Sequence, residues 1–335
     1  MKDSIGVGVI GMGVFGTQHA RVWSEQPGAR LVAVADTVAE RARAGAERFG
    51  CSSFTDAREM LAMEDIDAVS VCTPDDLHRD PVVAALEAGK HVLVEKPFAT
   101  RVADCDAMMA AASRSGRILT VGHVLRFDPR YHLARQTVQR GDVGELVHMS
   151  ARRRNQVGAV DRLLGHTSVL CFLGAHELDF LSWCAGSRIV RVSCETVSKV
   201  LAPRKANDGY LAVLKYANGV IASLEASWVL PSGYAKLEAG AELFCSRGTV
   251  FVDGGATSLR VATSGPVTNP DVMYAPDVNG RSSGALRLEL EHFLSCVRTG
   301  AQPLVTAAEA RHVVEGISAM ALSAESGQSV ALSSD

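Results

Sequence analysis

The sequence has few aromatic residues and no long apolar run. Only 5% of its 335 residues are aromatic while 47% are hydrophobic, so aliphatic side chains must build its cores. No apolar stretch approaches the roughly 20 residues that cross a bilayer. The first residues, MKDSIGVGVIG, enter a strand-like run with no cleavable signal segment. We therefore expect no membrane partner and a soluble, cytoplasmic protein.

The cysteines and the charge exclude further classes. Eight cysteines are scattered with no C-x-x-C pair, which argues against a disulfide framework and a zinc site, so we expect reduced thiols and no metal. The net charge is -3 and no basic stripe is evident, so no nucleic-acid partner is expected. The short run Arg152, Arg153, Arg154 fits a solvated strand face better than a phosphate-binding patch.

The length suggests two domains, and the first 123 residues form one pattern. Short, Val-rich runs alternate with helix-like segments, which predicts a doubly wound parallel sheet, an α/β domain of the Rossmann type. The predicted strands are Ile5–Ile10, Leu31–Ala35, Ala68–Val71, His91–Val94 and Ile118–Val121. The predicted helices are Phe15–Ser24, Val38–Phe49, Asp76–Ala88 and Arg101–Ser115.

Residues 124–335 no longer show the regular alternation of strand and helix patterns, which predicts a second, α+β domain. Turn signals such as Asn218-Gly219 separate β-type runs, typical of an open, mostly antiparallel sheet with helices on one face. The predicted strands are Glu145–Asn155, Arg188–Ser198, Tyr210–Tyr216, Val220–Val229, Leu237–Cys245 and Thr249–Val252. The predicted helices are Pro129–Arg140, Val169–Cys184, Ala285–Arg298 and Ala307–Ser326, with a loop over 262–284.

A glycine-rich loop follows the first predicted strand and precedes a helix. In this context G-x-G-x-x-G indicates dinucleotide binding, because its glycines allow a tight turn, backbone approach to a pyrophosphate, and close helix packing. The helix N-terminus adds N–H donors for the phosphates. The residues expected to bind the cofactor here are Gly11, Met12, Gly13, Val14, Phe15 and Gly16.

Asp36 ends the second strand, 20 positions after Gly16. A carboxylate there accepts hydrogen bonds from the adenosine ribose and repels a 2′-phosphate, which favours NAD over NADP. Two alternatives stay open. Asp36 could cap the helix that begins near Val38, and Arg41 or Arg43 could accommodate a 2′-phosphate.

The third and fourth strands end in polar residues. Ligands of such sheets lie at the carboxyl ends of the strands, so Thr73 and Pro74 are expected to contact the cofactor. His78, on the following helix, is either a cofactor contact or a surface or packing residue. The fourth strand ends in Glu95-Lys96-Pro97, a charged pair whose burial is costly unless function requires it.

The sequence resembles the glucose–fructose oxidoreductase, inositol dehydrogenase and MocA family along nearly its whole length. The motifs that carry the resemblance are GMGVFG, TPDDLH, AGKHVLVEKP at 88–97, VGHVLRF at 121–127 and GAHELDFLSW at 174–183. The resemblance implies NAD(P)-dependent oxidation or reduction of a sugar, cyclitol or related polyol. It also implies homodimers or homotetramers that form through the sheet of the second domain.

Two residues are the expected catalytic groups. Alcohol oxidation needs a base, and a cation that stabilises the developing alkoxide. The resemblance assigns the cation to Lys96, which it places where cofactor and substrate meet and so among the cofactor-binding residues, and it assigns the base to His176. Glu95 is expected to contact the nicotinamide side of the cofactor or to shape the turn. The competing interpretations are a Glu95–Lys96 ion pair and a core histidine. By helical spacing, five residues share one face: Phe172, His176, Asp179, Phe180 and Trp183.

Substrate contacts are less well defined. The resemblance suggests Asn155, His166 and Tyr234, besides Lys96 and His176, as substrate-binding residues. His123, like Arg126, is expected near the nicotinamide or at the domain hinge. Inositol dehydrogenases of the family carry an aspartate four residues before the catalytic histidine, where this chain has Phe172. Inositol itself is therefore a doubtful substrate.

These patterns favour an NAD-dependent dehydrogenase acting on a secondary alcohol. Two alternatives remain: a catalytically inactive, dinucleotide-binding regulator on the same fold, and an NADP-dependent carbonyl or imine reductase. Phe172 favours the regulator slightly, whereas Lys96 and His176 disfavour it, and Asp36 argues against the reductase.

Overall fold

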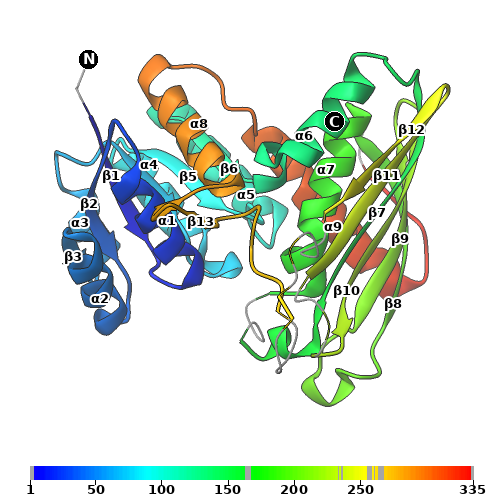
Figure 1. Cartoon of the computed structure of the whole chain (residues 1–335), viewed down its shortest axis with the longest axis horizontal. Coiled ribbons are helices and arrows are strands. Elements are labelled where there is room, and N and C mark those ends of the chain that lie inside the picture. Colours follow the sequence, from blue (N-terminus) through cyan, green and yellow to red (C-terminus); the bar gives the residue numbers. More distant parts are fainter. Residues whose placement is uncertain are drawn as a thin grey trace. The chain divides into compact units, whose positions relative to one another are not determined.

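A computed structural model describes residues 4–162, 167–232, 234, 237–254, 259, 261–262 and 268–332 of the chain (Figure 1). The chain divides into two compact units. The first comprises Met1–Val124 and Met273–Arg311, and the second comprises Leu125–Val272 and His312–Asp335. The first unit includes Val124 and 273–311, which the sequence-based division placed in the second domain.

The first unit contains a six-stranded sheet in the order β3-β2-β1-β4-β5-β6 whose neighbouring strands are all parallel. The predicted Rossmann-type sheet is thus confirmed. Its strands are β1 (Ile5–Ile10), β2 (Ala29–Ala35), β3 (Ser52–Phe54), β4 (Ala68–Val71), β5 (His91–Glu95) and β6 (Leu119–Gly122). The sequence analysis missed β3, because its three residues form no buried apolar run.

Helices and short turns connect these strands. The helices of the first unit are α1 (Val14–Glu25), α2 (Ala39–Phe49), α3 (Ala57–Leu61), α4 (Arg79–Glu87), α5 (Val102–Ser115) and α8 (Ala285–Thr299). Short 3-10 turns of the chain lie at Asp75–Leu77, Val124–Phe127, Val157–Arg162 and Ala202–Arg204.

Helix α8 shares a core with α1 and β1, which is why 273–311 joins the first unit. Phe293 packs edge-on against Trp23, with ring centroids 6.4 Å apart. Two short strands, β13 (Asp277–Val278) and β14 (Arg281–Ser282), pair within the region predicted as loop. The packing of α8 against α1 and β1 cannot be predicted from local sequence patterns, because these elements lie far apart in the sequence.

The second unit contains a seven-stranded sheet in the order β12-β11-β7-β10-β9-β8-β15. Strands β7 and β10 are parallel and the other neighbours are antiparallel, so the predicted mostly antiparallel sheet is confirmed. Its strands are β7 (Leu146–Gln156), β8 (Ile189–Val197), β9 (Gly209–Tyr216), β10 (Ile221–Leu230), β11 (Leu237–Cys245), β12 (Gly248–Asp253) and β15 (Val330–Ala331).

Helices cover one face of this sheet. They are α6 (Pro129–Gln139), α7 (Ala175–Ala185) and the part of α9 (Ala307–Ser326) from His312 onward, and Figure 1 shows α7 and α9 along the same face. Side chains alternate across each strand: on β9, Leu214 is fully buried whereas its neighbour Val213 is 55% exposed. The sheet thus has one helix-covered face and one outer face.

Among the described residues, no helix is both long and apolar enough to span a membrane. All eight cysteines are free thiols. In the same part of the chain, no group of three or more His, Cys, Asp or Glu side chains is placed to hold a metal ion.

Candidate functional site

The glycine loop between β1 and α1 has the space and the backbone that a dinucleotide needs. Gly11 has a φ of +90°, and a Cβ there would lie 2.7 Å from the Cys72 carbonyl oxygen. A Cβ on Gly16 would lie 1.7 Å from the Gly11 carbonyl oxygen, so only glycine permits this packing. A Cβ on Gly13 would meet nothing within 4 Å. The loop is therefore open on the side where the N-terminus of α1 can receive a phosphate.

Asp36, at the end of β2, braces this loop. Its Oδ2 accepts a hydrogen bond from the Met12 N–H at 2.7 Å, and its Oδ1 accepts one from the Val38 N–H at 2.8 Å. Helix α2 has Val38 at its N-cap without a side-chain cap, so Asp36 supports the turn before the helix. Arg41 and Arg43 are exposed. The contact of Asp36 with a ribose stays a prediction.

His78 is not a surface residue. Its side chain is buried between the ends of β4 and β5, with 1% of the residue exposed. The Nε2 atom lies 3.0 Å from the Thr73 carbonyl oxygen, and the Nδ1 atom lies 2.9 Å from the Pro97 carbonyl oxygen. The Thr73 hydroxyl donates to the Leu77 carbonyl oxygen at 3.2 Å. His78 thus links two strand ends at the edge where the cofactor is expected.

The charged pair Glu95-Lys96 lies at the carboxyl end of β5, and both residues are buried. Glu95 Oε1 lies 3.1 Å from His19 Nε2, and Glu95 Oε2 accepts a hydrogen bond from the Lys96 backbone N–H at 3.1 Å. Burial alone would raise the pKa of the Glu95 carboxyl, but His19 and Lys96 outweigh it and hold this pKa below its ordinary value. Glu95 is therefore an ionised group that shapes the turn before Lys96.

His176 lies at the start of α7, directly after a π-helical turn at Leu170–Gly174. Between Val169 and Leu181, only Phe172 and His176 are half-buried, and the remaining residues are buried. The Phe172 ring lies beside Trp228 of β10, with centroids 6.3 Å apart. Phe172 and His176 therefore share the accessible side of this helical segment.

The predicted single face of five residues is divided in the structure. Asp179 binds Arg126 through two hydrogen bonds of 2.7 and 3.0 Å. Phe180 packs edge-on against Tyr131, with centroids 4.8 Å apart. The π-helical turn holds more residues per turn than an α-helix, so the 3.6-residue period does not continue from Phe172 into α7.

Arg126 and His123 are both buried near the end of β6. Arg126, 2% exposed, is held by Asp179, and its guanidinium carbon lies 5.2 Å from the Trp183 ring centroid. The side chain of Arg126 therefore belongs to the core of the second unit. His123 follows β6 and is 1% exposed, and its backbone N–H donates to the Val121 carbonyl oxygen. A role of His123 toward the nicotinamide stays a prediction.

Two of the predicted substrate contacts, Asn155 and Tyr234, each bind Gln156 at the carboxyl end of β7. Asn155 Oδ1 accepts a hydrogen bond from the Gln156 N–H at 2.7 Å, and the Gln156 amide donates to the Tyr234 carbonyl oxygen at 2.7 Å. The Tyr234 residue is half exposed. His166 lies outside the described residues.

A buried ion pair lies beside His176, and the solvated strand face predicted for Arg152, Arg153 and Arg154 is wrong for Arg153. Arg153 of β7 donates from Nε to both carboxylate oxygens of Glu177, at 2.8 and 2.7 Å, and neither residue is more than 5% exposed. This pair fixes the first turn of α7 to the sheet. Its only signal was the inward position of Arg153 in the strand alternation.

Comparison with known proteins identifies both halves of the chain. Residues 5–123 match the oxidoreductase family with an NAD-binding Rossmann fold, and residues 131–251 match the GFO/IDH/MocA C-terminal domain. Inositol 2-dehydrogenase 4 of Saccharopolyspora erythraea is 33% identical over 304 residues, 88% of this chain and 86% of that protein. The scyllo-inositol 2-dehydrogenase (NAD(+)) of Bacillus subtilis is 28% identical over 312 residues, 91% and 90% of the two chains.

Solved structures share the fold. A myo-inositol dehydrogenase from Corynebacterium glutamicum superposes with a TM-score of 0.84 at 23% identity, over 99% of this chain and all of that one. The open glycine loop and Asp36 fit the NAD that the family description implies. The chain belongs to the GFO/IDH/MocA family of oxidoreductases, with an NAD-binding Rossmann domain.

Proposed function

We propose that this protein transfers a hydride between NAD and a secondary alcohol of a cyclitol, sugar or related polyol, with Lys96 and His176 as its catalytic groups. The observation that carries the proposal is the buried Glu95-Lys96 turn at the carboxyl end of β5. Ligands of such sheets lie at this edge. A buried ammonium there can stabilise the negative charge that develops on the oxygen when an alcohol is oxidised.

NAD, when bound, supplies the hydride acceptor. The groups of this chain that would hold it are the glycine loop from Gly11 to Gly16, with Asp36 for the ribose and Thr73 and Pro74 at the end of β4. The open space at Gly13 supports this assignment, because a pyrophosphate needs close approach to the backbone there.

Lys96 would stabilise the negative charge that develops on the alcohol oxygen, and His176 would accept the hydroxyl proton. The Lys96 ammonium, only 7% of whose residue is exposed, stabilises negative charge on the substrate oxygen more effectively than a solvated cation would. His176 is half-buried and accessible, so its ring can accept the hydroxyl proton. In the reverse direction, the same two groups polarise a carbonyl and return the proton.

The substrate class rests on the relatives. Proteins described as inositol 2-dehydrogenases are similar to this chain over most of its length. Phe172 separates it from the inositol dehydrogenase pattern that the sequence analysis described, and the ring lies on the accessible side shared with His176. We therefore propose a cyclic polyol other than inositol.

The test is NADH formation with a panel of cyclitols and sugars, followed by a single substitution. Lys96→Met should lower kcat about 100–1,000-fold, as loss of a group that stabilises the transition-state charge does, and should leave NAD binding in place. The matched control is Lys199→Met, because Lys199 is exposed. Full turnover by Lys96→Met would sink the assignment, and absence of turnover by the native protein on every polyol would favour the regulator.

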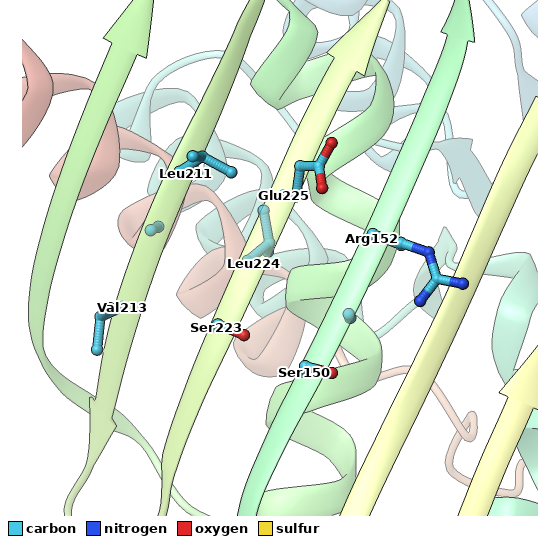
Figure 2. Close-up of a pocket in the computed structure, with 9 residues that line it drawn as sticks. Ser150, Arg152, Leu211, Val213, Ser223, Leu224 and Glu225 are labelled. Atoms are coloured by element: carbon cyan, nitrogen blue, oxygen red, sulfur yellow. The ribbon is translucent and has the colours of Figure 1, made fainter.

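We further propose that two copies associate through the outer face of the second unit's sheet. Figure 2 shows the hollow in this face, lined by residues that include Leu211, Val213, Ser150, Arg152 and Glu225. Leu211 and Val213 are exposed on the same face of β9, and contiguous exposed apolar side chains rimmed by polar residues mark interaction surfaces. A cytoplasmic location also stays a prediction, which the eight free thiols support and which cell fractionation would test.

A further inference from the structure

We propose that two buried histidines, His19 and His78, are positioning residues that fix the main chain on either side of Lys96. The inference rests on the proposed catalytic role of Lys96. It concerns groups of the first unit alone, and these groups come from α1, the start of α4 and the end of β5.

His19 acts on the residue before Lys96. Its side chain is fully buried on α1, and its Nε2 atom lies 3.1 Å from Glu95 Oε1. The second carboxylate oxygen of Glu95 accepts the Lys96 backbone N–H at 3.1 Å. A chain of two hydrogen bonds therefore runs from the imidazole to the main chain of Lys96, and its middle member is an ionised carboxylate.

His78 acts on the residue after Lys96. Both of its ring nitrogens face main-chain carbonyl oxygens, Nδ1 that of Pro97 at 2.9 Å and Nε2 that of Thr73 at 3.0 Å. A carbonyl oxygen only accepts a hydrogen bond, so at these contacts the ring nitrogen that carries the proton is the donor. His78 thereby holds the turn after Lys96 against the end of the neighbouring strand, β4.

The two contacts matter because catalytic groups tolerate little displacement. A misplacement of about 1 Å can cost a factor of about 100 in rate, and the four-carbon stem of a lysine does not by itself fix its ammonium. Helix α1 carries His19 and also begins in the glycine loop that the cofactor would use. The His19–Glu95 contact therefore fixes the position of Lys96 relative to α1, the helix that would hold the cofactor phosphates.

A double-substitution cycle separates positioning from simple stabilisation of the core. His19→Leu should lower kcat about 10–100-fold in the native background. The same substitution should change kcat by less than about two-fold when Lys96→Met is already present, because coupled residues are not additive. His19→Gln, whose amide can reach toward Glu95, should recover most of the loss. An equal loss in both backgrounds would overturn the proposal.

His91 supplies the matched control. It lies on the same strand at the opposite end, where its Nδ1 accepts the Ile118 N–H at 3.1 Å. His91→Gln should change thermal stability without changing kcat. His78→Gln tests the second contact and keeps the proposal falsifiable if His19→Leu does not fold: it should lower kcat in the native background but not in the Lys96→Met background, and an equal loss in both would again overturn the proposal.

Hydrogen exchange gives a readout that needs no turnover. The Lys96 amide should exchange at least about 10-fold faster in His19→Leu than in the native protein, and no faster in His91→Gln, as measured by mass spectrometry on peptides that cover 92–98. Unchanged exchange would overturn the positioning role. Faster exchange in a protein that oxidises no polyol would retain that role and reject the proposed function instead.

Discussion

Phe172 stands where the inositol dehydrogenases of the family, as the sequence analysis describes them, carry an aspartate. Its ring rests beside Trp228, whose indole N–H donates to the Asn207 carbonyl oxygen at 2.8 Å and is thereby held in place. An aromatic ring at this position offers a substrate an apolar contact and no proton acceptor. A substrate that places a ring C–H face there is favoured over one that places a hydroxyl there.

Replacing Phe172 by aspartate tests this interpretation. Phe172→Asp should raise kcat/KM for inositol at least about 10-fold relative to the native protein, because one well-placed hydrogen bond to a hydroxyl contributes about 1–2 kcal/mol. Steady-state NADH formation measures it. Phe172→Leu is the control, since it removes the ring without adding an acceptor. No gain on inositol from the aspartate would contradict the assignment of specificity to this position.

At the scale of single elements, the buried Arg153–Glu177 pair anchors the first turn of α7 to strand β7. The side chains of this pair are 6% and 1% exposed, so neither charge has water as an alternative partner. Removing one member of such a pair leaves the other charge buried without compensation. The pair is therefore more important to stability than its neighbour on the strand, Arg154–Glu225, whose side chains are 34% and 27% exposed.

Glu177→Gln should lower the free energy of unfolding by about 3–5 kcal/mol, measured by urea denaturation. The control is Glu225→Gln, which breaks the more exposed pair on the same strand and should cost about 0–1 kcal/mol. If the two substitutions cost the same, the burial of Arg153 is not what makes the pair important.

Glu95 makes the first unit sensitive to acid. Its pKa in the folded protein lies below the ordinary value of 4.5, because the contacts with His19 and Lys96 outweigh burial. A carboxyl with a lowered pKa stabilises the fold above its unfolded pKa, and this stabilisation is lost as the pH falls through the lower, folded value. The difference in unfolding free energy between the native protein and Glu95→Gln should therefore shrink as the pH drops from 6 to 3.

The control for this measurement is Glu87→Gln, because the Glu87 carboxylate is 60% exposed and its pair with Arg114 is solvated. Its effect should be small at every pH. A difference between the native protein and Glu95→Gln that stays constant from pH 6 to pH 3 would contradict the lowered pKa.

At the scale of the whole molecule, local patterns predicted the two sheets, whereas contacts between residues far apart in the sequence were not predictable. Strands such as β1 and β4 were predictable because burial on both faces leaves a continuous apolar run. The place of α8 was not, since it depends on packing against α1, far away in sequence. The role of His19 was likewise hidden, because its partner Glu95 lies 76 positions away.

The outer sheet face allows a last prediction about assembly. Leu211 and Val213 of β9 are 61% and 55% exposed, and Phe251 of β12 is 71% exposed. Between these strands the face carries both signs of charge, in the pairs Arg154–Glu225 and Arg152–Glu238. A face with both apolar and mixed charged patches can match a second copy of itself about a two-fold axis, as isologous interfaces require.

We therefore expect the native protein to sediment as a dimer or a tetramer, and Leu211→Asp to shift it toward the monomer by placing a charge where apolar contacts are needed. Analytical ultracentrifugation measures the mass. Leu133→Asp is the control, because Leu133 of α6 is also 58% exposed but lies off this face. A monomeric native protein, or an oligomer that Leu211→Asp leaves intact, would contradict the assignment of this face. In the proposed dimer, the apolar side chains that are exposed in the single chain would be buried against the second copy.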